Sequence, residues 1–485
     1  MAHGAPVLAA DGPAEGYRTR RVVRLASTAA LGGFLFGFDS AVINGANTAI
    51  AETFNLGSGL MAFVVSIALI GSAVGAWFAG QLADAFGRRR VMLIAAVLFG
   101  ISAVGTAFPP NVEILMVWRL IGGAGIGVAS VVAPMYIAEI SPAQLRGRMG
   151  SLQQLAIVLG ILATGISNYV IVSLAGSSTS DWLLGIEAWR WMFLVMLIPA
   201  TIYFLMALRI PESPRFLVER GKLDEARAVL ESVFTSDQSA KVLEIQTSME
   251  GANRSSLSDL RGPRFGLMPI VWIGILLSAF QQFVGINAVF YYSNLIWESV
   301  GFSQDQAFLT SMITNAVNVA TTLVAIALID RVGRKRLLLV GSSGMVVMLA
   351  TLTIIFGTAP QVSNGEGGME PSLVGTTSTV AVLAFNAYVV FFGMSWGPVV
   401  WVLLGEMFPN RIRAAALALA ASAQWIANFI VSSAFPPIAT RSLMIAYGIF
   451  TVFALASIFF VRAKVPETMG KSLEQISAES MKVPA

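Results

Sequence analysis

The 485-residue sequence contains no cysteine and only one histidine, His3, which lies in a polar N-terminal segment. Without cysteine the chain forms no disulfide bond, thiolate metal site or thiol nucleophile. With a single histidine it lacks the residues for histidine-ligated haem or zinc and for Ser-His catalysis. We therefore expect no enzyme activity, no bound metal and no organic cofactor.

Charged residues are also scarce, at 12% of the chain, whereas soluble domains carry roughly 25%. Hydrophobic residues make up 56% of the chain. Because a bilayer core takes roughly 20 apolar residues per helix, the sequence predicts an all-α integral membrane protein. Twelve windows nearly free of charge are the expected transmembrane helices: 22–48, 60–82, 91–110, 112–138, 149–174, 190–208, 267–297, 306–329, 337–357, 375–404, 414–435 and 442–461.

The positive charges indicate neither a nucleic-acid partner nor a signal peptide. The net charge of +4 does not indicate a nucleic-acid partner, because there is no soluble domain to carry a basic surface. The arginine-rich segment before the first span lacks the short apolar core and small-residue cleavage site of a signal peptide. We expect the first span to remain as an anchor.

The positions of lysine and arginine predict the orientation, because cytoplasmic loops retain them. All but three of the 31 bases lie in the two tails or in loops that follow even-numbered spans; the exceptions are Arg119, Arg190 and Arg441. Both termini are then cytoplasmic, in agreement with an even number of spans. The predicted segments are a tail (1–21), a first six-helix bundle (22–209), a linker with short helices (210–265), a second bundle (266–462) and a tail (463–485).

The two halves of the chain repeat each other weakly. DAFGRRR at 84–90 follows the second span and DRVGRKR at 330–336 follows the eighth. EISPAQLR follows the fourth span and EMFPNRIR the tenth, with glutamate, proline and arginine at the same offsets. Cytoplasmic topology alone explains the bases but not the acids, Asp84, Glu139, Asp330 and Glu406. We predict two cytoplasmic charge clusters that hold helices together, with surface ion pairs of about 0–1 kcal/mol that reopen thermally.

Eight strings, in order, resemble the sugar porter family of the major facilitator superfamily across nearly the whole chain, and are most similar to its bacterial proton-coupled glucose and xylose symporters. They are GGFLFGFD (32–39), DAFGRRR, WRLIGGAGIGVASVVAPMYIAEISPAQLRGR (118–148), PESPRFL (211–217), QQFVGINAVFYY (281–292), DRVGRKR, GEMFP (405–409) and VPETMGKSLEQI (465–476).

The resemblance implies two six-helix bundles of the major facilitator fold that rock about a central sugar site, in a multi-pass protein of the cell (inner) membrane that works as a monomer. With the repeat, it implies cytoplasmic charge latches made by Asp84, Arg88, Glu139, Arg146, Arg148, Glu212, Arg215, Asp330, Arg334, Glu406 and Arg413.

Amide side chains lie inside three of the apolar spans, the seventh, the eighth and the eleventh. A sugar needs groups that both donate and accept hydrogen bonds, and amides near the bilayer midplane are costly unless they find partners. Gln281, Asn318 and Gln424 each lie roughly 17–21 Å from their cytoplasmic helix ends at 1.5 Å per residue. The alternative for any one of them is helix-to-helix hydrogen bonding. The predicted sugar-binding amides are Gln281, Gln282, Asn287, Asn318, Gln424 and Asn428.

The resemblance adds further residues to this site. It implies Gln154, Gly397, Trp401 and Trp425, with Phe36 and Ile161 as apolar walls. The residues alone would favour membrane-facing packing for both tryptophans. The family uses tyrosines as an outer gate at the positions of Tyr291 and Tyr292, for which an interfacial aromatic belt is the alternative.

One acid and one base lie inside opposing spans. Asp39 and Arg119 are about 13 Å and 10 Å deep at 1.5 Å per residue, so they can meet. Protonation of the buried carboxylate would leave Arg119 unpaired and shift the helices, which gives a proton switch without histidine. The alternative is a static ion pair. In the family an aspartate at position 39 accompanies proton symport and an asparagine accompanies passive facilitation.

Other functional classes fit less well. A channel would show rings of charge or a filter loop, and an enzyme would show a nucleophile, metal cluster or acid pair. A non-transporting sugar sensor is the remaining alternative, although such relatives usually add long cytoplasmic tails. We expect a sugar:proton symporter that imports a monosaccharide, with the proton as coupling ion. Glucose is favoured by overall likeness, with xylose, galactose, arabinose or inositol, or passive hexose or pentose transport, as alternatives.

Overall fold

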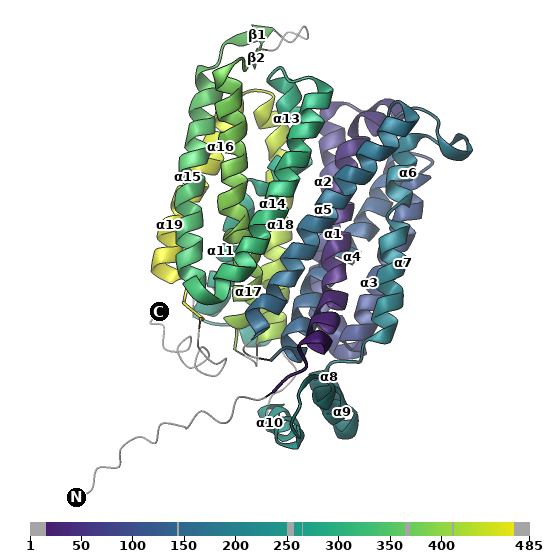
Figure 1. Ribbon diagram of the computed structural model, residues 1–485, viewed down its shortest axis with the longest axis vertical. Helices are drawn as coiled ribbons and strands as arrows, with labels where there is room; N and C mark the ends of the chain where they lie inside the picture. Colours follow the sequence, from purple (N-terminus) through teal and green to yellow (C-terminus); the bar gives the residue numbers. More distant parts are fainter. Residues whose placement is uncertain are drawn as a thin grey trace, which may run out of the picture.

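The computed structural model describes residues 16–142, 145–249, 257–263, 265–363, 369–409 and 412–469, and almost all of its elements are helices (Figure 1). The first half contains α1 (Thr19–Thr53), α2 (Ser58–Phe86), α3 (Arg88–Ala107), α4 (Val112–Ile140), α5 (Arg146–Ala175), the 3₁₀ turn η2 (Leu183–Gly185), α6 (Ala188–Leu194) and α7 (Leu197–Arg209).

The linker contains α8 (Pro214–Glu219), α9 (Leu223–Val233), α10 (Ser239–Met249) and the 3₁₀ turn η3 (Leu257–Leu260). The second half contains α11 (Pro269–Phe283), α12 (Ile286–Tyr291), α13 (Ser293–Ser299), α14 (Gln304–Val332), α15 (Arg334–Thr358), α16 (Thr376–Gly393), α17 (Trp396–Glu406), α18 (Arg413–Ala439) and α19 (Leu443–Lys464). Within the described residues, the only sheet is the antiparallel ribbon of β1 (Gln361–Ser363) and β2 (Met369–Pro371).

Twelve helical segments of the described chain are long and apolar enough to cross a membrane, and each overlaps one of the predicted windows. Their outward faces carry exposed apolar side chains such as Val74, Ile198, Leu383 and Phe459. In water such faces would be an aggregation hazard, whereas a bilayer solvates them. The predicted all-α membrane class is confirmed.

The linker helices lie beyond one end of the bundle, which we name the linker end (Figure 1). Helix α9 buries Ala226, Val229 and Leu230 against the protein and exposes Asp224 and Glu225. This is the one-sided pattern expected of a surface helix. The linker thus contains short helices, among them α8 and α9.

The repeat between the halves extends to the backbone. Gly87 separates α2 from α3 with φ +90°, and Gly333 separates α14 from α15 with φ +93°. A Cβ at Gly87 would lie 2.4 Å from Glu212 Oε2, and one at Gly333 would lie 2.8 Å from Glu467 Oε2. Both the positive φ and the close carboxylate therefore require glycine at these turns.

Three of the predicted spans are divided between helices. The window 190–208 is divided into α6 and α7 at Val195–Met196. The window 267–297 is divided into α11, α12 and the start of α13, with Gly285 in the left-handed region (φ +91°). The window 375–404 is divided into α16 and α17 at Met394–Ser395. The predicted windows do not show these breaks, because hydropathy is equally high on both sides of each one, and each window still corresponds to one candidate membrane span. Such discontinuous helices are a feature of transporter binding sites.

Helices of the two halves pack against each other along two seams. Within the first half α1 packs on α5 and α2 on α4, and within the second α15 packs on α19 and α11 on α18. Between the halves, α2 contacts α18 and α5 contacts α14. The candidate site described next lies where α1, α4, α11, α14, α17 and α18 face the centre.

Candidate functional site

Asp39 on α1 and Arg119 on α4 form a buried ion pair, with 1% and 2% of each residue exposed. Arg119 Nη1 lies 3.4 Å from Asp39 Oδ1 and donates to the Asp39 carbonyl oxygen at 3.2 Å. Asp39 Oδ2 and Arg119 Nε have no hydrogen-bond partner among the described residues. The two side chains therefore meet as their depths predict, but as an incompletely satisfied pair, which is costly to bury.

The amides of α11 and α12 form a chain of hydrogen bonds. Gln281 Nε2 donates to the carbonyl oxygens of Trp396 (2.9 Å) and Gly397 (3.3 Å), at the break before α17. Gln282 Nε2 donates to Gln281 Oε1 at 3.3 Å, and Asn287 Nδ2 donates to Gln282 Oε1. All three predicted residues of this stretch are thus brought together, and the start of α17 provides the carbonyl groups that Gln281 binds.

Two other amides carry unpartnered oxygens. Asn318 on α14 and Gln424 on α18 are 2% and 3% exposed. Asn318 Oδ1 and Gln424 Oε1 have no hydrogen-bond partner among the residues that the structure describes. One helical turn beyond Gln424, Asn428 is fully buried, and its Oδ1 accepts from Ser432 Oγ at 3.0 Å. Helix-to-helix hydrogen bonding therefore does not account for the Asn318 and Gln424 oxygens.

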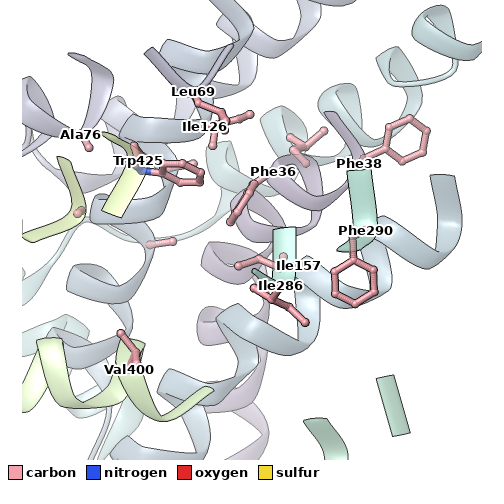
Figure 2. Close-up of a cluster of buried hydrophobic side chains, with 14 of the residues drawn as sticks. Phe36, Phe38, Leu69, Ala76, Ile126, Ile157, Ile286, Phe290, Val400 and Trp425 are labelled. Carbon is pink, nitrogen blue, oxygen red and sulfur yellow. The ribbon is translucent and has the colours of Figure 1, made fainter. Parts of the chain in front are cut away.

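Aromatic and apolar side chains from both halves border the amides. Phe36 of α1 meets Trp425 of α18 edge to face at 4.9 Å, beside Leu69 and Ile126 (Figure 2). Trp425 Nε1 donates to Ser130 Oγ of α4 at 3.3 Å. With Trp401 only 4% exposed and Trp425 1%, neither ring faces the membrane.

The remaining residues of the predicted sugar site are Gln154 and Ile161 on α5 and Gly397 on α17. Gln154 is buried, and its Nε2 would lie 3.4 Å from a Cβ at Gly397, so this amide reaches across to the second half. Ile161, two turns further along α5, is half-buried.

Tyr291 and Tyr292 end α12, and each is only 5% exposed, so neither lies in an exposed interfacial belt. The Tyr292 hydroxyl donates to the Ser432 carbonyl oxygen at 3.0 Å. Asn428 Nδ2 donates to the Tyr291 hydroxyl at 3.4 Å. Tyr291 also lines a cavity of about 10 Å³ with Ser40 and Arg119. One tyrosine thus borders both the amide group and the buried ion pair.

The first charge cluster lies at the linker end. Arg88 binds Glu139 through two atoms, Nη2 to Oε1 at 3.0 Å and Nε to Oε2 at 3.1 Å, and its Nη2 lies 3.4 Å from Asp84 Oδ1. Glu212 Oε1 accepts from the Arg88 backbone N–H at 2.8 Å, and Ser213 Oγ donates to Glu139 Oε2.

The second cluster repeats the first almost atom for atom. Arg334 binds Glu406 through Nη2 to Oε1 at 2.9 Å and Nε to Oε2 at 3.2 Å, and Asp330 Oδ1 at 3.0 Å. Glu467 Oε1 accepts from the Arg334 backbone N–H at 3.0 Å, and Thr468 Oγ1 donates to Glu406 Oε2 at 2.6 Å.

Prediction from the sequence missed Ser213, Glu467 and Thr468. A signal for them exists, since Pro-Glu-Ser at 211–213 and Pro-Glu-Thr at 466–468 repeat each other. The expectation of weak surface pairs was also wrong, because the side chains of Arg88 and Arg334 are only 4% and 5% exposed.

The other predicted latch residues are placed differently. Arg215 is half-buried and acts electrostatically on Asp84. Arg148 is exposed, and Arg413 donates through Nε to the Phe408 carbonyl oxygen at 3.2 Å. The Arg146 side chain lies outside the described part of the structure. The second cluster touches the first half, because a Cβ at Gly147 would lie 2.3 Å from Asp330 Oδ1.

Known proteins are similar to this chain over almost its whole length. A family model described as "Sugar (and other) transporter" matches residues 25–479. A glucose transport protein of Synechocystis sp. is 52% identical over 457 residues, which cover 94% of this chain and 97% of that protein. A D-xylose-proton symporter of Escherichia coli (strain K12) is 38% identical over 497 residues, covering 95% and 96%.

A solved structure gives the same result for the fold. A proton:xylose symporter of the major facilitator superfamily, bound to 6-bromo-6-deoxy-D-glucose, is 36% identical with a TM-score of 0.84, and the match covers 96% of this chain and 100% of that chain. The resemblance and the fold predicted from the sequence are confirmed. The chain belongs to the sugar transporter family of the major facilitator superfamily, whose members are multi-pass membrane transporters.

Proposed function

We propose that this protein imports a monosaccharide, glucose in first place, together with a proton, by alternating access. The observation that carries the proposal is the buried, incompletely satisfied Asp39–Arg119 pair beside a group of amides and aromatic rings. The names of the similar glucose transport protein and of the xylose and arabinose proton symporters support both substrate class and coupling ion. No chemical change of the sugar is required, so the protein acts as a carrier and not as an enzyme.

In this mechanism a proton and a sugar enter from outside. Protonation of Asp39 removes its charge from Arg119, and the sugar hydroxyls donate to the free amide oxygens of Asn318 and Gln424. The predicted halves, 22–209 and 266–462, then rock about the site, and both ligands leave to the cytoplasm. Deprotonated Asp39 pairs with Arg119 again and resets the carrier. Tyr291 and Tyr292 close the outer side of the site.

The cellular setting follows from the charges. The linker end is proposed to be cytoplasmic because loops there carry most lysines and arginines, which places both termini on that side of the cell (inner) membrane. Each chain holds a complete site between its own halves, so the monomer is the proposed working unit.

The test is sugar uptake by membrane vesicles with and without a pH gradient, with glucose, xylose, galactose, arabinose and inositol as competitors. Asp39→Asn should abolish uphill accumulation and spare counterflow, since the amide is neutral like the protonated acid but cannot release a proton. Asp181→Asn, the same change at an exposed loop residue, is the control. Retained accumulation in Asp39→Asn would show that Asp39 is not the coupling group. Sugar uptake by the unaltered protein that does not depend on the pH gradient would favour passive facilitation, and no transport of any sugar would favour a sensor.

A further inference from the structure

Asp39 has a second polar neighbour inside the first half, outside the small cavity lined by Ser40, Arg119 and Tyr291, which we name the crevice. A Cβ at Gly122 of α4 would lie 3.5 Å from Asp39 Oδ2 and 2.4 Å from Ser102 Oγ of α3. The unpartnered carboxylate oxygen and the serine hydroxyl therefore face each other across a glycine. Ser102 Oγ donates to the Trp118 carbonyl oxygen at 2.8 Å, so its oxygen is left to accept a hydrogen bond. A water molecule between them would donate to both oxygens.

Thr106 continues this polar track by one helical turn. It lies four residues after Ser102 on α3 and therefore on the same face. It is 1% exposed, and its Oγ1 has no hydrogen-bond partner among the described residues. The buried threonines Thr28 and Thr164 instead donate to the carbonyl oxygen four residues earlier. A buried hydroxyl that does not bond its own helix is costly unless water reaches it.

Ser102 and Thr106 lie near the end of α3 that is opposite the linker end. Arg190 Nη1 donates to the carbonyl oxygen of Ala107, the residue after Thr106, at 2.8 Å. Arg190 Nε binds Glu187 Oε2 at 2.7 Å, and these side chains are 20% and 29% exposed. Ser102 and Arg119 lie only about 8 Å and 10 Å from the ends of their helices at 1.5 Å per residue. Ser102 and Thr106 thus lie on α3 between Asp39 and the end of the helix, where a partly exposed charge pair binds the Ala107 carbonyl oxygen.

The crevice side of the pair is shared with the predicted sugar site, because Tyr291 borders both. The cavity of about 10 Å³ there is lined by Ser40, Arg119 and Tyr291 but also by four apolar side chains, Val65, Ala68, Leu69 and Ile126. The groups that face Asp39 from other helices are therefore Arg119 of α4, Ser102 of α3 and Tyr291 of α12. The hydroxyls of Ser40 and Tyr291 lead from the pair to Asn428 and so into the amide group of the sugar site, whereas Ser102 and Thr106 lead away from that group.

We propose that Asp39 receives its proton through the interior of the first half, along Thr106 and Ser102, separately from the sugar. The inference rests on the proposed proton coupling. A water over Gly122 gives a proton to Asp39 Oδ2: one water O–H bond breaks and a carboxyl O–H bond forms. That water regains a proton from the next water, held at Thr106, so that one proton passes from the outer solution to the carboxylate while Arg119 stays protonated.

The test uses the full chain in proteoliposomes with a pH-sensitive dye inside. Ser102→Ala and the isosteric Thr106→Val should each slow sugar-dependent proton entry about tenfold, the equivalent of one lost hydrogen bond. Sugar counterflow at one uniform pH should stay within about twofold, because the sugar site is unchanged. Thr106→Ser, which keeps the hydroxyl, should restore proton entry. Thr28→Val, the same change at an equally buried position near the linker end, should have no effect.

Three other results would overturn the route. Normal proton entry in both variants would mean that protons reach Asp39 through the crevice. Equal losses of proton entry and counterflow would mean that the hydroxyls only support the fold, as would failure of Thr106→Ser to restore coupling. If the unaltered protein shows no proton entry with sugar, the symport proposal itself fails, which is a separate outcome.

Discussion

Unpartnered oxygens distinguish Asn318 and Gln424 from the other amides of the site. A buried acceptor without a donor costs about 1–3 kcal/mol, so these two oxygens destabilise the protein in the absence of a ligand. A sugar hydroxyl would donate to either of them. The amides of Gln281 and Gln282, in contrast, already bind protein groups and can be retained for structural reasons alone.

We therefore expect that removing a free amide oxygen lowers the affinity for sugar without lowering the stability of the protein. Gln424→Met keeps the length of the side chain and removes the free acceptor, so the thermal unfolding midpoint without sugar should stay the same or rise. Sugar affinity, measured by calorimetry in detergent, should fall about tenfold, the equivalent of roughly 1.4 kcal/mol. Gln81→Met, the same change at an exposed residue of α2, is the control and should change neither. A lower midpoint with normal affinity would instead assign Gln424 to helix packing.

Sequence alone predicted that Asp39 and Arg119 meet, but not that Asp39 Oδ2 is left without a hydrogen-bond partner among the described residues. Depth along a helix follows from a fixed rise per residue, so two opposite charges at similar depth can be paired by counting residues from the helix ends. The free Oδ2 of Asp39 and the nearby hydroxyl of Ser102 depend on how α3 packs against α4 at Gly122. Hydropathy reports how apolar a segment is and does not indicate in which direction a side chain points.

At the scale of helices and turns, the two charge clusters are a repeated unit of buried bonds. In each, one arginine at the start of a helix binds two carboxylates by its side chain, and a third carboxylate by its backbone N–H. Carboxylates at a helix N-terminus are also favoured by the helix dipole. Because the arginines are nearly inaccessible to water, loss of a carboxylate leaves a charge that solvent does not compensate.

Removing one acid should therefore cost far more here than at an exposed pair. Glu406→Gln and Glu139→Gln should each lower the free energy of unfolding by about 3 kcal/mol, with similar values because the geometry repeats. Glu231→Gln breaks an exposed pair with Arg227, whose side chains are 42% and 47% exposed, and should change the free energy of unfolding far less because water solvates both charges. Thermal unfolding midpoints of the three variants give the comparison, and equally small shifts in all three would contradict it.

Helices were easier to predict than their interruptions. Twelve apolar windows located the twelve spans because the requirement for apolar length is imposed by the bilayer. The breaks at Gly285 and at Met394–Ser395 lie inside apolar runs, where hydropathy does not change. They are set by tertiary packing, in which Gln281 binds the carbonyl oxygens at the start of α17.

On the scale of the whole molecule, the two halves touch at both ends. At the linker end, Gly147 of the first half lies against Asp330 and Arg334 of the second. At the opposite end, Ser66 Oγ of α2 and Ser433 Oγ of α18 are 3.0 Å apart, and Phe63 meets Phe429 with ring centroids at 6.5 Å. Alternating access requires that these contacts open in turn.

A disulfide in place of the serine contact would test that requirement. The chain has no cysteine, so Ser66→Cys with Ser433→Cys introduces the only two thiols. Hydroxyls 3.0 Å apart lie close to the spacing that a disulfide needs. Oxidation should abolish net uptake and counterflow, since the site can no longer open at this end, and reduction should restore both. Each single cysteine variant, treated with the same oxidant, is the control. Full transport by the oxidised, cross-linked protein would show that the halves need not separate here, and would contradict rocking of the two bundles.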